Sequence, residues 1–337
     1  MKTVILDAGK SESITLCVNV LRNGGLVAFS TETVYGLGAN ALDEKAVAGI
    51  FSVKGRQEDN PLIVHVASVD DIKPLVVKIP DVFESLVEKF LPGPLTLIMR
   101  KSSVVPDNVT AGLDTVAVRI PEHPAALALI QAFGGPVAAP SANPSGMPSP
   151  TKALHVFNDL NGKIPYILDG GDCRVGVEST VLDITNEIPK ILRPGSVTYE
   201  QLKEVLKNVD VAGTKAVDKP MSPGMKYRHY APKVSLMAVV GSPAKTADYI
   251  ASLVNSDTAA LMFDDYAFSH PNVVSFGNSE DHVSQASCLY DALRKADSLD
   301  VSAIYAQVPK EEGLGSTVAN RLKRAAGSNI VDLSDQF

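Results

Sequence analysis

Residues 210–233 form an irregular segment that separates two parts of the chain with different patterns of apolar residues. Before this segment, short apolar runs follow one another, some without a helix between them, which favours an α/β fold with a mixed sheet. After it, apolar runs alternate steadily with amphipathic helices, as in a small parallel sheet of the Rossmann type. The sequence therefore predicts a first domain at 1–209, a linker at 210–233 and a second domain at 234–337.

The length and charge of the chain narrow the classes of protein to which it can belong. Its 337 residues suffice for two domains, and 45% of them are hydrophobic, which is an ordinary globular composition. The net charge of −7 argues against a general nucleic-acid binder, which would normally be basic. A bound anion therefore requires a local cluster of cationic side chains.

Signals for membranes, export and metals are weak. No apolar run reaches the ~18–20 residues that a membrane helix needs, and Asp7 interrupts the first residues too early for a signal peptide. The three cysteines are widely spaced, so they indicate neither a disulfide framework nor a zinc site. We expect a cytoplasmic protein without a membrane partner.

Local patterns place several elements within the first domain. Asp43 is an N-cap residue and predicts a helix that runs to about Val53. The spacing of apolar residues predicts another helix over 69–77. The segment 31–38 contains two glycines and predicts a loop.

The linker has an unusual composition at Ser222–Pro232. Lys226, Arg228 and His229 are interleaved there with two tyrosines. A solvated spacer needs none of these side chains, so the segment predicts a surface that holds an anionic and flat ligand.

Two further segments carry side chains suited to a ligand with phosphates. Lys54 and Arg56 follow a predicted helix, and a point charge beside a planar guanidinium suits a polyphosphate. A solvated turn could contain the same residues. The loop 140–151 is rich in hydroxyl and amide groups and follows a buried strand, where ligands bind in α/β folds.

Arg119 lies in an otherwise apolar strand, and an unpaired buried arginine is costly. Its anionic partner could be an internal aspartate or the carboxylate of a ligand. Another polar group consists of Glu178-Ser179-Thr180, before a strand, and Arg193, at the end of the next strand. The sequence contains no nucleophile elbow, P-loop, dinucleotide fingerprint or metal-ligand spacing.

Eight motifs occur in order along the chain: S-T-E-T-V-Y-G-L-G-A-N-A, K-G-R followed by N-P-L-I-V-H, L-P-G-P-L-T-L-I, V-A-V-R-I-P, A-P-S-A-N-P-S-G, G-V-E-S-T-V-L-D, L-R-P-G and S-P-G-M-K-Y-R-H-Y-A-P. Together they resemble the Sua5 branch of the Sua5/YrdC/YwlC family, the L-threonylcarbamoyl-adenylate synthases. The resemblance covers nearly the whole chain. It implies a YrdC-like first domain, with a twisted mixed sheet and a concave cleft, and a small Rossmann-like second domain.

The resemblance also implies an activity and partners. The enzyme would be a nucleotidyltransferase that makes L-threonylcarbamoyl-AMP and pyrophosphate from ATP, L-threonine and bicarbonate or CO2. A tRNA threonylcarbamoyl-transferase of the Kae1/TsaD type would then move the group to the adenosine beside the anticodon of ANN-decoding tRNAs. The family further implies a weak contact with tRNA or double-stranded RNA.

The motifs carry two substrate sites over to this chain. The L-threonine site would comprise Thr33, His65, Arg119, Ser179 and the main chain at Ala139. The ATP site would comprise Lys54, Arg56, Asn60, Thr115, Ser141, Asn143, Ser149, Arg193 and His229. Ala139 stands where serine is frequent in the family, so any contact there would be made by the main chain.

The implied chemistry requires no covalent enzyme intermediate. The carboxylate of N-carboxy-threonine attacks the α-phosphate of ATP, a displacement that needs alignment and charge neutralisation. We expect Lys54, Arg56 and Arg193 to hold the phosphates. Mg²⁺ would arrive with ATP and be held by phosphates and water, because no carboxylate cluster is evident. The linker would be a lid whose His229 reaches the nucleotide.

Two other functions fit parts of the sequence. A module that binds tRNA or double-stranded RNA could use the same cations without catalysis, but Arg119 in an apolar strand suits a small carboxylate better than an RNA backbone. Carbamoyl transfer, as in the YrdC-like part of hydrogenase maturation factors, would be accompanied by cysteine pairs and an acylphosphatase segment that this sequence lacks.

Overall fold

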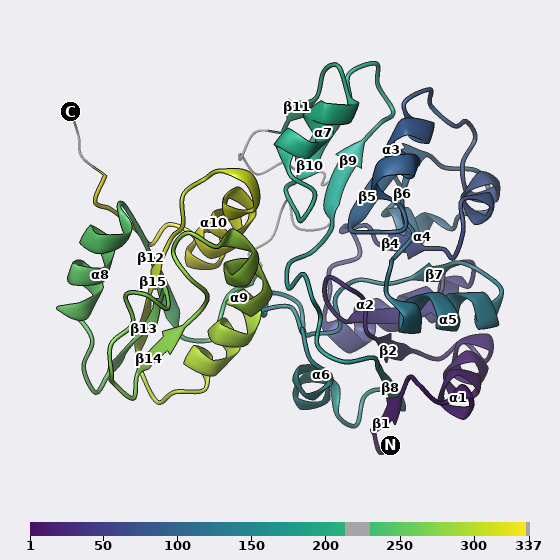
Figure 1. The fold of residues 1–337 in the computed structure, drawn as a ribbon. Helices are drawn as coiled ribbons and strands as arrows, with labels where there is room; N and C mark the ends of the chain where they lie inside the picture. Colours follow the sequence, from purple (N-terminus) through teal and green to yellow (C-terminus); the bar gives the residue numbers. More distant parts are fainter. Residues whose placement is uncertain (213–229, 335–337) are drawn as a thin grey trace. The chain divides into compact units, whose positions relative to one another are not determined.

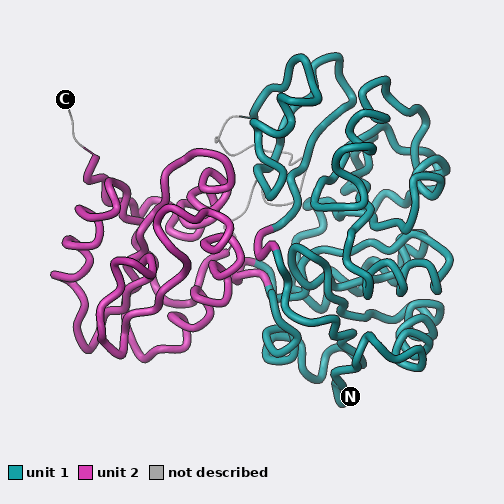
Figure 2. Tube along the Cα trace, viewed as in Figure 1, with its two compact units in different colours: residues 1–145, 150–174, 178–226 teal, residues 146–149, 175–177, 227–337 magenta. Residues whose placement is uncertain are grey.

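The computed structural model describes residues 1–212 and 230–334, and the chain divides into two compact units (Figures 1 and 2). Within the described residues, unit 1 comprises 1–145, 150–174 and 178–212. Unit 2 comprises 230–334 and two short stretches of the amino-terminal half, 146–149 and 175–177.

Unit 1 is built on one sheet of eleven strands in the order β1-β8-β2-β3-β7-β4-β6-β5-β9-β10-β11. Parallel pairs such as β4 with β6 stand beside antiparallel pairs such as β5 with β6, which confirms the predicted mixed sheet. The strands are β1 (Val4–Asp7), β2 (Val27–Phe29), β3 (Gly36–Asn40), β4 (Ile63–His65), β5 (Leu95–Arg100), β6 (Thr115–Arg119), β7 (Val137–Ala138), β8 (Tyr166–Asp169), β9 (Thr180–Asp183), β10 (Lys190–Arg193) and β11 (Asp210–Val211).

Side-chain caps mark the beginning of three helices of unit 1, α2, α5 and α7. Asp43 accepts hydrogen bonds from the main-chain N–H groups of Lys45 and Ala46, and Gly55 in the left-handed region ends the same helix, so Lys54 falls on its last turn. The helical elements are α1 (Ser11–Arg22), α2 (Glu44–Lys54), the 3₁₀ helix η1 (Asp70–Leu75), α3 (Phe83–Phe90), α4 (Asp107–Thr110), α5 (Pro124–Phe133), α6 (Ala153–Leu160) and α7 (Tyr199–Val205).

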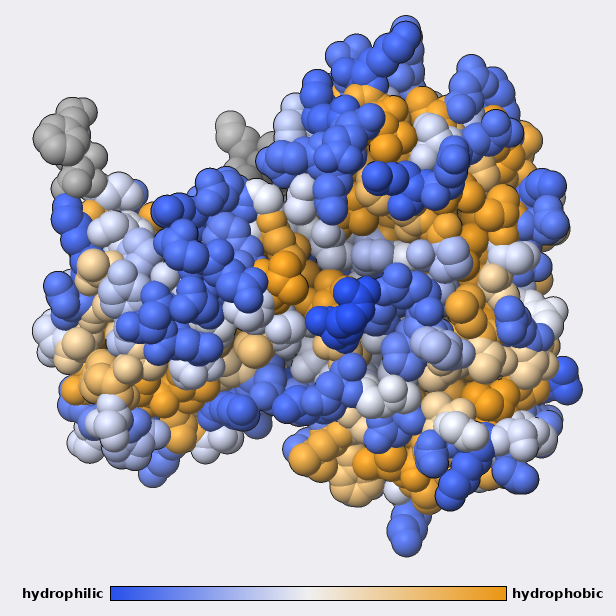
Figure 3. Space-filling model, viewed as in Figure 1, coloured by the Kyte–Doolittle hydropathy of each residue, from blue (hydrophilic) through white to orange (hydrophobic). Residues whose placement is uncertain are grey.

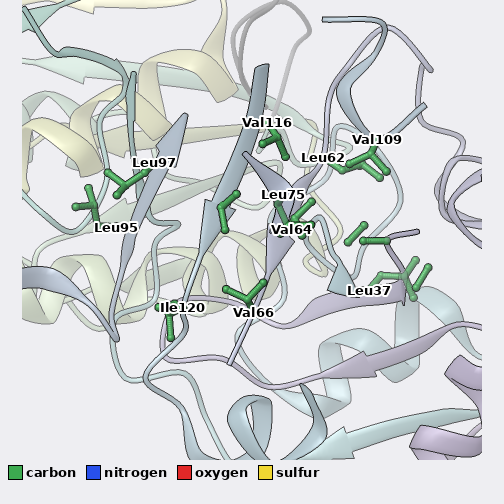
Figure 4. Close-up of a cluster of buried hydrophobic side chains, with 14 of the residues drawn as sticks. Leu37, Leu62, Val64, Val66, Leu75, Leu95, Leu97, Val109, Val116 and Ile120 are labelled. Atoms are coloured by element: carbon green, nitrogen blue, oxygen red, sulfur yellow. The ribbon is translucent and has the colours of Figure 1, made fainter. Parts of the chain in front are cut away.

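Most of the apolar core of unit 1 lies on one face of the sheet. Side chains of α2, η1, α3, α4, α6 and α7 pack there against alternate strand residues, among them Leu37, Val64 and Leu97 (Figure 4). On the other face, α1 and α5 pack against β2, β7 and β8. The sheet is therefore covered by helices on both faces at one end.

At the other end, the second face carries a different layer. Its buried residues all come from strands, and among the described residues no helix contributes to it; we call it the strand cluster, and its members are Ile63, Ile98, Ala117, Val181 and Leu192. Because successive side chains of a strand point to opposite faces, the polar residues two positions away from these lie on the same face.

Unit 2 has a sheet of five strands in the order β14-β13-β15-β12-β16, and its neighbouring strands pair in parallel (Figure 1). This arrangement confirms the predicted Rossmann-like sheet. The elements are β12 (Ser235–Val240), α8 (Pro243–Ala251), β13 (Thr258–Met262), β14 (Val273–Ser275), α9 (His282–Asp297), β15 (Ala303–Gln307), α10 (Gly313–Ala326) and β16 (Ile330–Asp332).

The stretches 146–149 and 175–177 belong to unit 2 because its helix α9 contacts both. Arg294 of α9 donates a hydrogen bond to the carbonyl oxygen of Pro148 at 2.6 Å. Gly176 has a φ of +77°, and a Cβ at this position would overlap the backbone of α9, so only glycine fits. The sequence did not indicate that unit 2 includes parts of the amino-terminal half.

Three local predictions need correction. The loop predicted at 31–38 ends early, because Gly36–Asn40 is strand β3. Its glycines serve packing, since a Cβ on Gly38 would lie 2.8 Å from the ring of Phe29. The helix predicted over 69–77 is the shorter η1, which contains Pro74, and proline disfavours an α-helix interior. The first two residues assigned to the linker form β11, which pairs with β10.

The molecular face drawn in Figure 3 mixes hydrophilic and hydrophobic residues. Over residues 1–212 and 230–334, the structure contains no helix whose length and hydropathy would allow it to span a bilayer.

Candidate active site

Two of the predicted threonine-binding residues lie at the ends of adjacent strands of unit 1. His65 ends β4 and Arg119 ends β6, and the two residues are partners in the parallel register. Each lies two positions after a member of the strand cluster, Ile63 or Ala117, so both side chains belong to the same face of the sheet. The fold thus places a cation and an imidazole side by side on this face.

Arg119 is buried and forms an ion pair with Glu32, which lies between β2 and β3. Its Nε also donates to the carbonyl oxygen of Gly93 at 3.3 Å. The internal partner of Arg119 is therefore a glutamate, and the aspartate considered from the sequence is wrong. The described residues engage two of the N–H groups of Arg119, whereas a guanidinium offers about five. The side chain is fixed in place with donor capacity left for a ligand.

His65 is buried beside this pair. Its Nδ1 atom has no hydrogen-bond partner among the residues that the structure describes. Its ring meets that of Phe29 edge to face, with centroids 6.3 Å apart. Burial, reinforced by the charge of Arg119, lowers the pKa of His65 from 6.5 to about 3, so the imidazole is neutral at neutral pH.

This neutral imidazole should make the stability of the protein depend on pH. Between pH 6.5 and about pH 3, His65 is protonated in the unfolded chain but stays neutral in the native state. The contribution of His65 to the free energy of unfolding is therefore complete above pH 6.5. It is lost as the pH falls, by up to about 1.4 kcal/mol per pH unit. In urea unfolding at several pH values between 7 and 4, wild type should lose stability more steeply than His65→Gln. Equal slopes for the two proteins would contradict the assignment.

Thr33 and Ala139, two further residues of the predicted threonine site, are buried. The Thr33 hydroxyl lies 2.9 Å from that of Thr31, within a turn in which Thr31 also donates to the carbonyl oxygen of Val34. The main-chain N–H of Ala139 donates to the carbonyl oxygen of Ile63 at 2.9 Å, so this N–H is already engaged in the sheet. The main-chain group of Ala139 that can contact a ligand is therefore its carbonyl oxygen.

Ser179, immediately before β9, contacts Arg193, which ends the neighbouring strand β10. Arg193 Nη2 donates to the main-chain oxygen of Ser179 at 2.8 Å and to its hydroxyl at 3.2 Å. That hydroxyl also lies 2.7 Å from the hydroxyl of Thr96 on β5. A Cβ on Gly195 would overlap the backbone of Ser179, so the chain can pass this closely only with glycine. The structure thus brings a residue predicted to bind threonine into contact with a residue predicted to bind phosphate.

Lys54 joins a second group of predicted residues. Its ammonium, at the end of α2, donates to the main-chain oxygens of Ser141 and Asn143. In return the N–H of Ser145 donates to the carbonyl oxygen of Lys54 at 2.9 Å. Burial, and then the charge of Arg56, lowers the pKa of Lys54 well below its usual range. An anionic ligand beside Lys54 would stabilise its charged form and raise its pKa again.

Arg56 and Asn60 form a third contact in the loop after α2. Arg56 Nη2 donates to the main-chain oxygens of Asn60 at 3.1 Å and Pro61 at 2.9 Å. The side-chain oxygen of Asn60 is buried and has no partner among the described residues. The predicted side-chain acceptor is therefore available at this position.

The remaining predicted ATP ligands are less closely connected. Thr115 begins β6 on the same face as Arg119 and is buried. Ser149 is buried within the stretch 146–149 of unit 2, whereas the other described members of both sites belong to unit 1. His229 lies outside the described residues, as does the predicted lid around it.

Sequence reasoning missed two polar residues of this region, Glu32 and Thr96. Both are buried, and both bond directly to predicted site residues. Glu32 stands inside the motif S-T-E-T-V-Y-G-L-G-A-N-A, and an acidic residue between two threonines in an otherwise uncharged segment is the signal that could have found it. Across the described ranges, no group of three or more His, Cys, Asp and Glu side chains could hold a metal ion.

Comparison with known proteins identifies the family to which both parts of the chain are similar. A Sua5/YciO/YrdC family model, described as "Telomere recombination", matches residues 19–195, and a model described as "Threonylcarbamoyl-AMP synthase, C-terminal domain" matches residues 197–327. The threonylcarbamoyl-AMP synthase of Pyrococcus abyssi is 45% identical over 325 residues, 94% of this chain and 95% of the relative. That of Bacillus subtilis is also 45% identical, over 93% of this chain and 92% of the relative.

Solved structures extend the comparison. The crystal structure of P. abyssi Sua5 complexed with L-threonine has a TM-score of 0.93, with 44% identity over 98% of this chain and 100% of that one. Escherichia coli YciO shares the fold of unit 1, with a TM-score of 0.51 at 22% identity over 58% of this chain and 94% of that one.

A mixed sheet that ends in buried cations, followed by a small parallel sheet, defines a two-domain α/β protein of the YrdC-like class. This chain belongs to the Sua5/YciO/YrdC family, in the Sua5 form that carries the additional carboxy-terminal domain.

Proposed function

We propose that the site of unit 1 makes L-threonylcarbamoyl-AMP and pyrophosphate from L-threonine, bicarbonate or CO2, and ATP. The protein is a nucleotidyltransferase, as its family membership and its 45% identity to the P. abyssi enzyme over 94% of the chain imply. The observation that carries the proposal is the buried Arg119 at the end of a strand. Glu32 and Gly93 hold its guanidinium in place and leave further N–H groups for a ligand, and such a guanidinium suits a small carboxylate.

L-Threonine binds through its carboxylate and through polar groups that line the site. Arg119 holds the carboxylate, and the buried Thr33, His65 and Ser179 line the site with hydroxyl and imidazole groups. The neutral state of His65 supports this role, because its imidazole can donate or accept a hydrogen bond without bringing a second cation beside Arg119.

ATP binds through its phosphates at Lys54, Arg56 and Arg193, assisted by Asn60, Thr115, Ser141, Asn143, Ser149 and His229. The N-carboxy-threonine oxygen attacks the α-phosphorus; a new P–O bond forms, the bond to the bridging oxygen breaks, and pyrophosphate leaves. Lys54, Arg56 and Arg193 neutralise the charge on the phosphates during this displacement. Mg²⁺ enters with ATP as part of the substrate, held by phosphates and water.

The product is an activated acyl-adenylate, so a transferase must consume it. We infer that this partner is a tRNA threonylcarbamoyl-transferase of the Kae1/TsaD type, which would complete N6-threonylcarbamoyladenosine in ANN-decoding tRNAs. A cytoplasmic location and a weak contact with tRNA or double-stranded RNA belong to the same proposal.

Release of pyrophosphate from ATP should require both L-threonine and bicarbonate. With Mg²⁺ and all three substrates, we expect equal amounts of pyrophosphate and threonylcarbamoyl-AMP, measured by a coupled phosphate assay and by mass spectrometry. Omitting L-threonine should reduce release to background, because no nucleophile then reaches the α-phosphate. Turnover that is undiminished without L-threonine would refute the proposed function.

A further inference from the structure

Glu32 combines burial with an unused hydrogen-bonding atom. Its side chain is 2% exposed. One carboxylate oxygen, Oε1, accepts from Arg119 Nη2, whereas Oε2 is buried and has no hydrogen-bond partner among the residues that the structure describes. A buried carboxylate oxygen without a hydrogen-bond donor is unfavourable. We therefore expect Oε2 of Glu32 to accept a hydrogen bond from a bound ligand.

The place of Glu32 limits what this donor can be. Glu32 immediately precedes Thr33 and pairs with Arg119, two residues of the proposed L-threonine site, in which Arg119 holds the carboxylate. An α-amino acid is a zwitterion, whose ammonium is only two bonds from its carboxylate carbon. A ligand carboxylate that binds the remaining donors of Arg119 therefore brings an ammonium close to the carboxylate of Glu32.

Charge points to the same ligand group. A second carboxylate at Arg119 would be repelled by Glu32, and an ammonium on that ligand offsets the repulsion. Glu32 and Arg119 together thus offer an acceptor and a donor of opposite charge, which matches a zwitterion and disfavours a simple carboxylic acid.

We propose that Glu32 binds the α-ammonium of the amino-acid substrate through Oε2 while its Oε1 orients Arg119. This proposal rests on the proposed function, because it assumes that the substrate carboxylate binds at Arg119. Glu32 then selects α-amino acids over hydroxy acids, and it holds the nitrogen that must be carboxylated at a fixed distance from the carboxylate anchor.

Isothermal titration of the full chain with two ligands tests the proposal. The probes are L-threonine and 3-hydroxybutanoate, which keeps the carboxylate and the hydroxyl and lacks the ammonium. Wild type should bind L-threonine at least about 10-fold more tightly than the analogue. In Glu32→Gln, which keeps the size of the side chain, L-threonine affinity should fall about 10- to 100-fold, whereas analogue affinity should not fall, because the repulsion of its carboxylate by Glu32 is removed. The preference for L-threonine should therefore largely disappear.

The matched control is Glu122→Gln, the same change in an exposed ion pair with Arg174, which should alter neither affinity. Equal losses of both ligands in Glu32→Gln would overturn the proposal, because they would mean that Glu32 only orients Arg119. If the variant does not fold, the wild-type comparison still decides: equal affinity for L-threonine and the analogue overturns the role of Glu32. Failure of wild type to bind L-threonine at all would instead overturn the proposed function.

Discussion

Replacing Lys54 with methionine is expected to lower threonine-dependent pyrophosphate release about 100- to 1,000-fold, the usual effect of losing one preorganised donor to a developing charge. Methionine keeps most of the volume of the side chain but removes the ammonium that contacts the carbonyl oxygens of Ser141 and Asn143. The loss should appear in kcat and in the affinity for ATP, and the affinity for L-threonine should change little. Steady-state kinetics with each substrate varied in turn measures the difference.

The matched control for this variant is Lys45→Met, an exposed lysine on the same helix. It should retain full activity, because it removes the same charge from α2 without touching the loop of Ser141. If the two variants were equally active, Lys54 would be a structural residue that ties the end of α2 to this loop, and its role as a phosphate ligand would be refuted.

The second large effect is expected on stability, at the buried pair of Glu32 and Arg119. Arg119→Met should reduce the free energy of unfolding by about 3–5 kcal/mol, because it strands a buried carboxylate. Adding Glu32→Met should recover most of that loss, since two apolar side chains of similar size leave no unpaired charge. Both variants should lack threonine-dependent turnover. Urea unfolding followed by circular dichroism, with a pyrophosphate assay, measures the two properties separately.

A control pair lies on the surface of the same unit. Arg174, paired with Glu122 and 73% exposed at the side chain, should tolerate Arg174→Met within about 1 kcal/mol. If Arg119→Met cost no more than this control, the pair with Glu32 would contribute nothing to the fold. A double variant as unstable as Arg119→Met would show that packing, and not the unpaired charge, causes the loss.

The elements of the fold could largely be predicted from the sequence, because their signals are local. The cap at Asp43 and the glycine at 55 place Lys54 on the last turn of α2, and the apolar run at 115–119 places Arg119 at the end of a strand. The local predictions that failed had different causes, since Pro74 disfavours the α-helix predicted over 69–77, whereas packing overrides the loop signal at 36–38. Gly36–Asn40 is a strand because its glycines make room for Phe29.

The contacts of the site depended on the tertiary structure. Lys54 meets carbonyl oxygens 87 and 89 residues further along the chain, and Arg119 meets an acidic residue 87 residues before it. No local pattern encodes such pairs. A resemblance to a family could name Arg119 and Thr33, but it gave no reason to single out Glu32 from the motif in which it stands.

Local sequence patterns were enough to predict the two types of sheet, the positions of most helices and strands, the family and the side chains suited to phosphate and carboxylate binding. Apolar periodicity, caps and motifs each depend on a few neighbouring residues, so they can be recognised without a structure. The folded chain was needed to show that Glu32 pairs with Arg119, that Arg193 bonds to Ser179, and that α9 contacts the stretches 146–149 and 175–177. The physical reason is that the pairing of buried charges and the close approach of backbones follow from strand order and register, which bring together residues far apart in the chain.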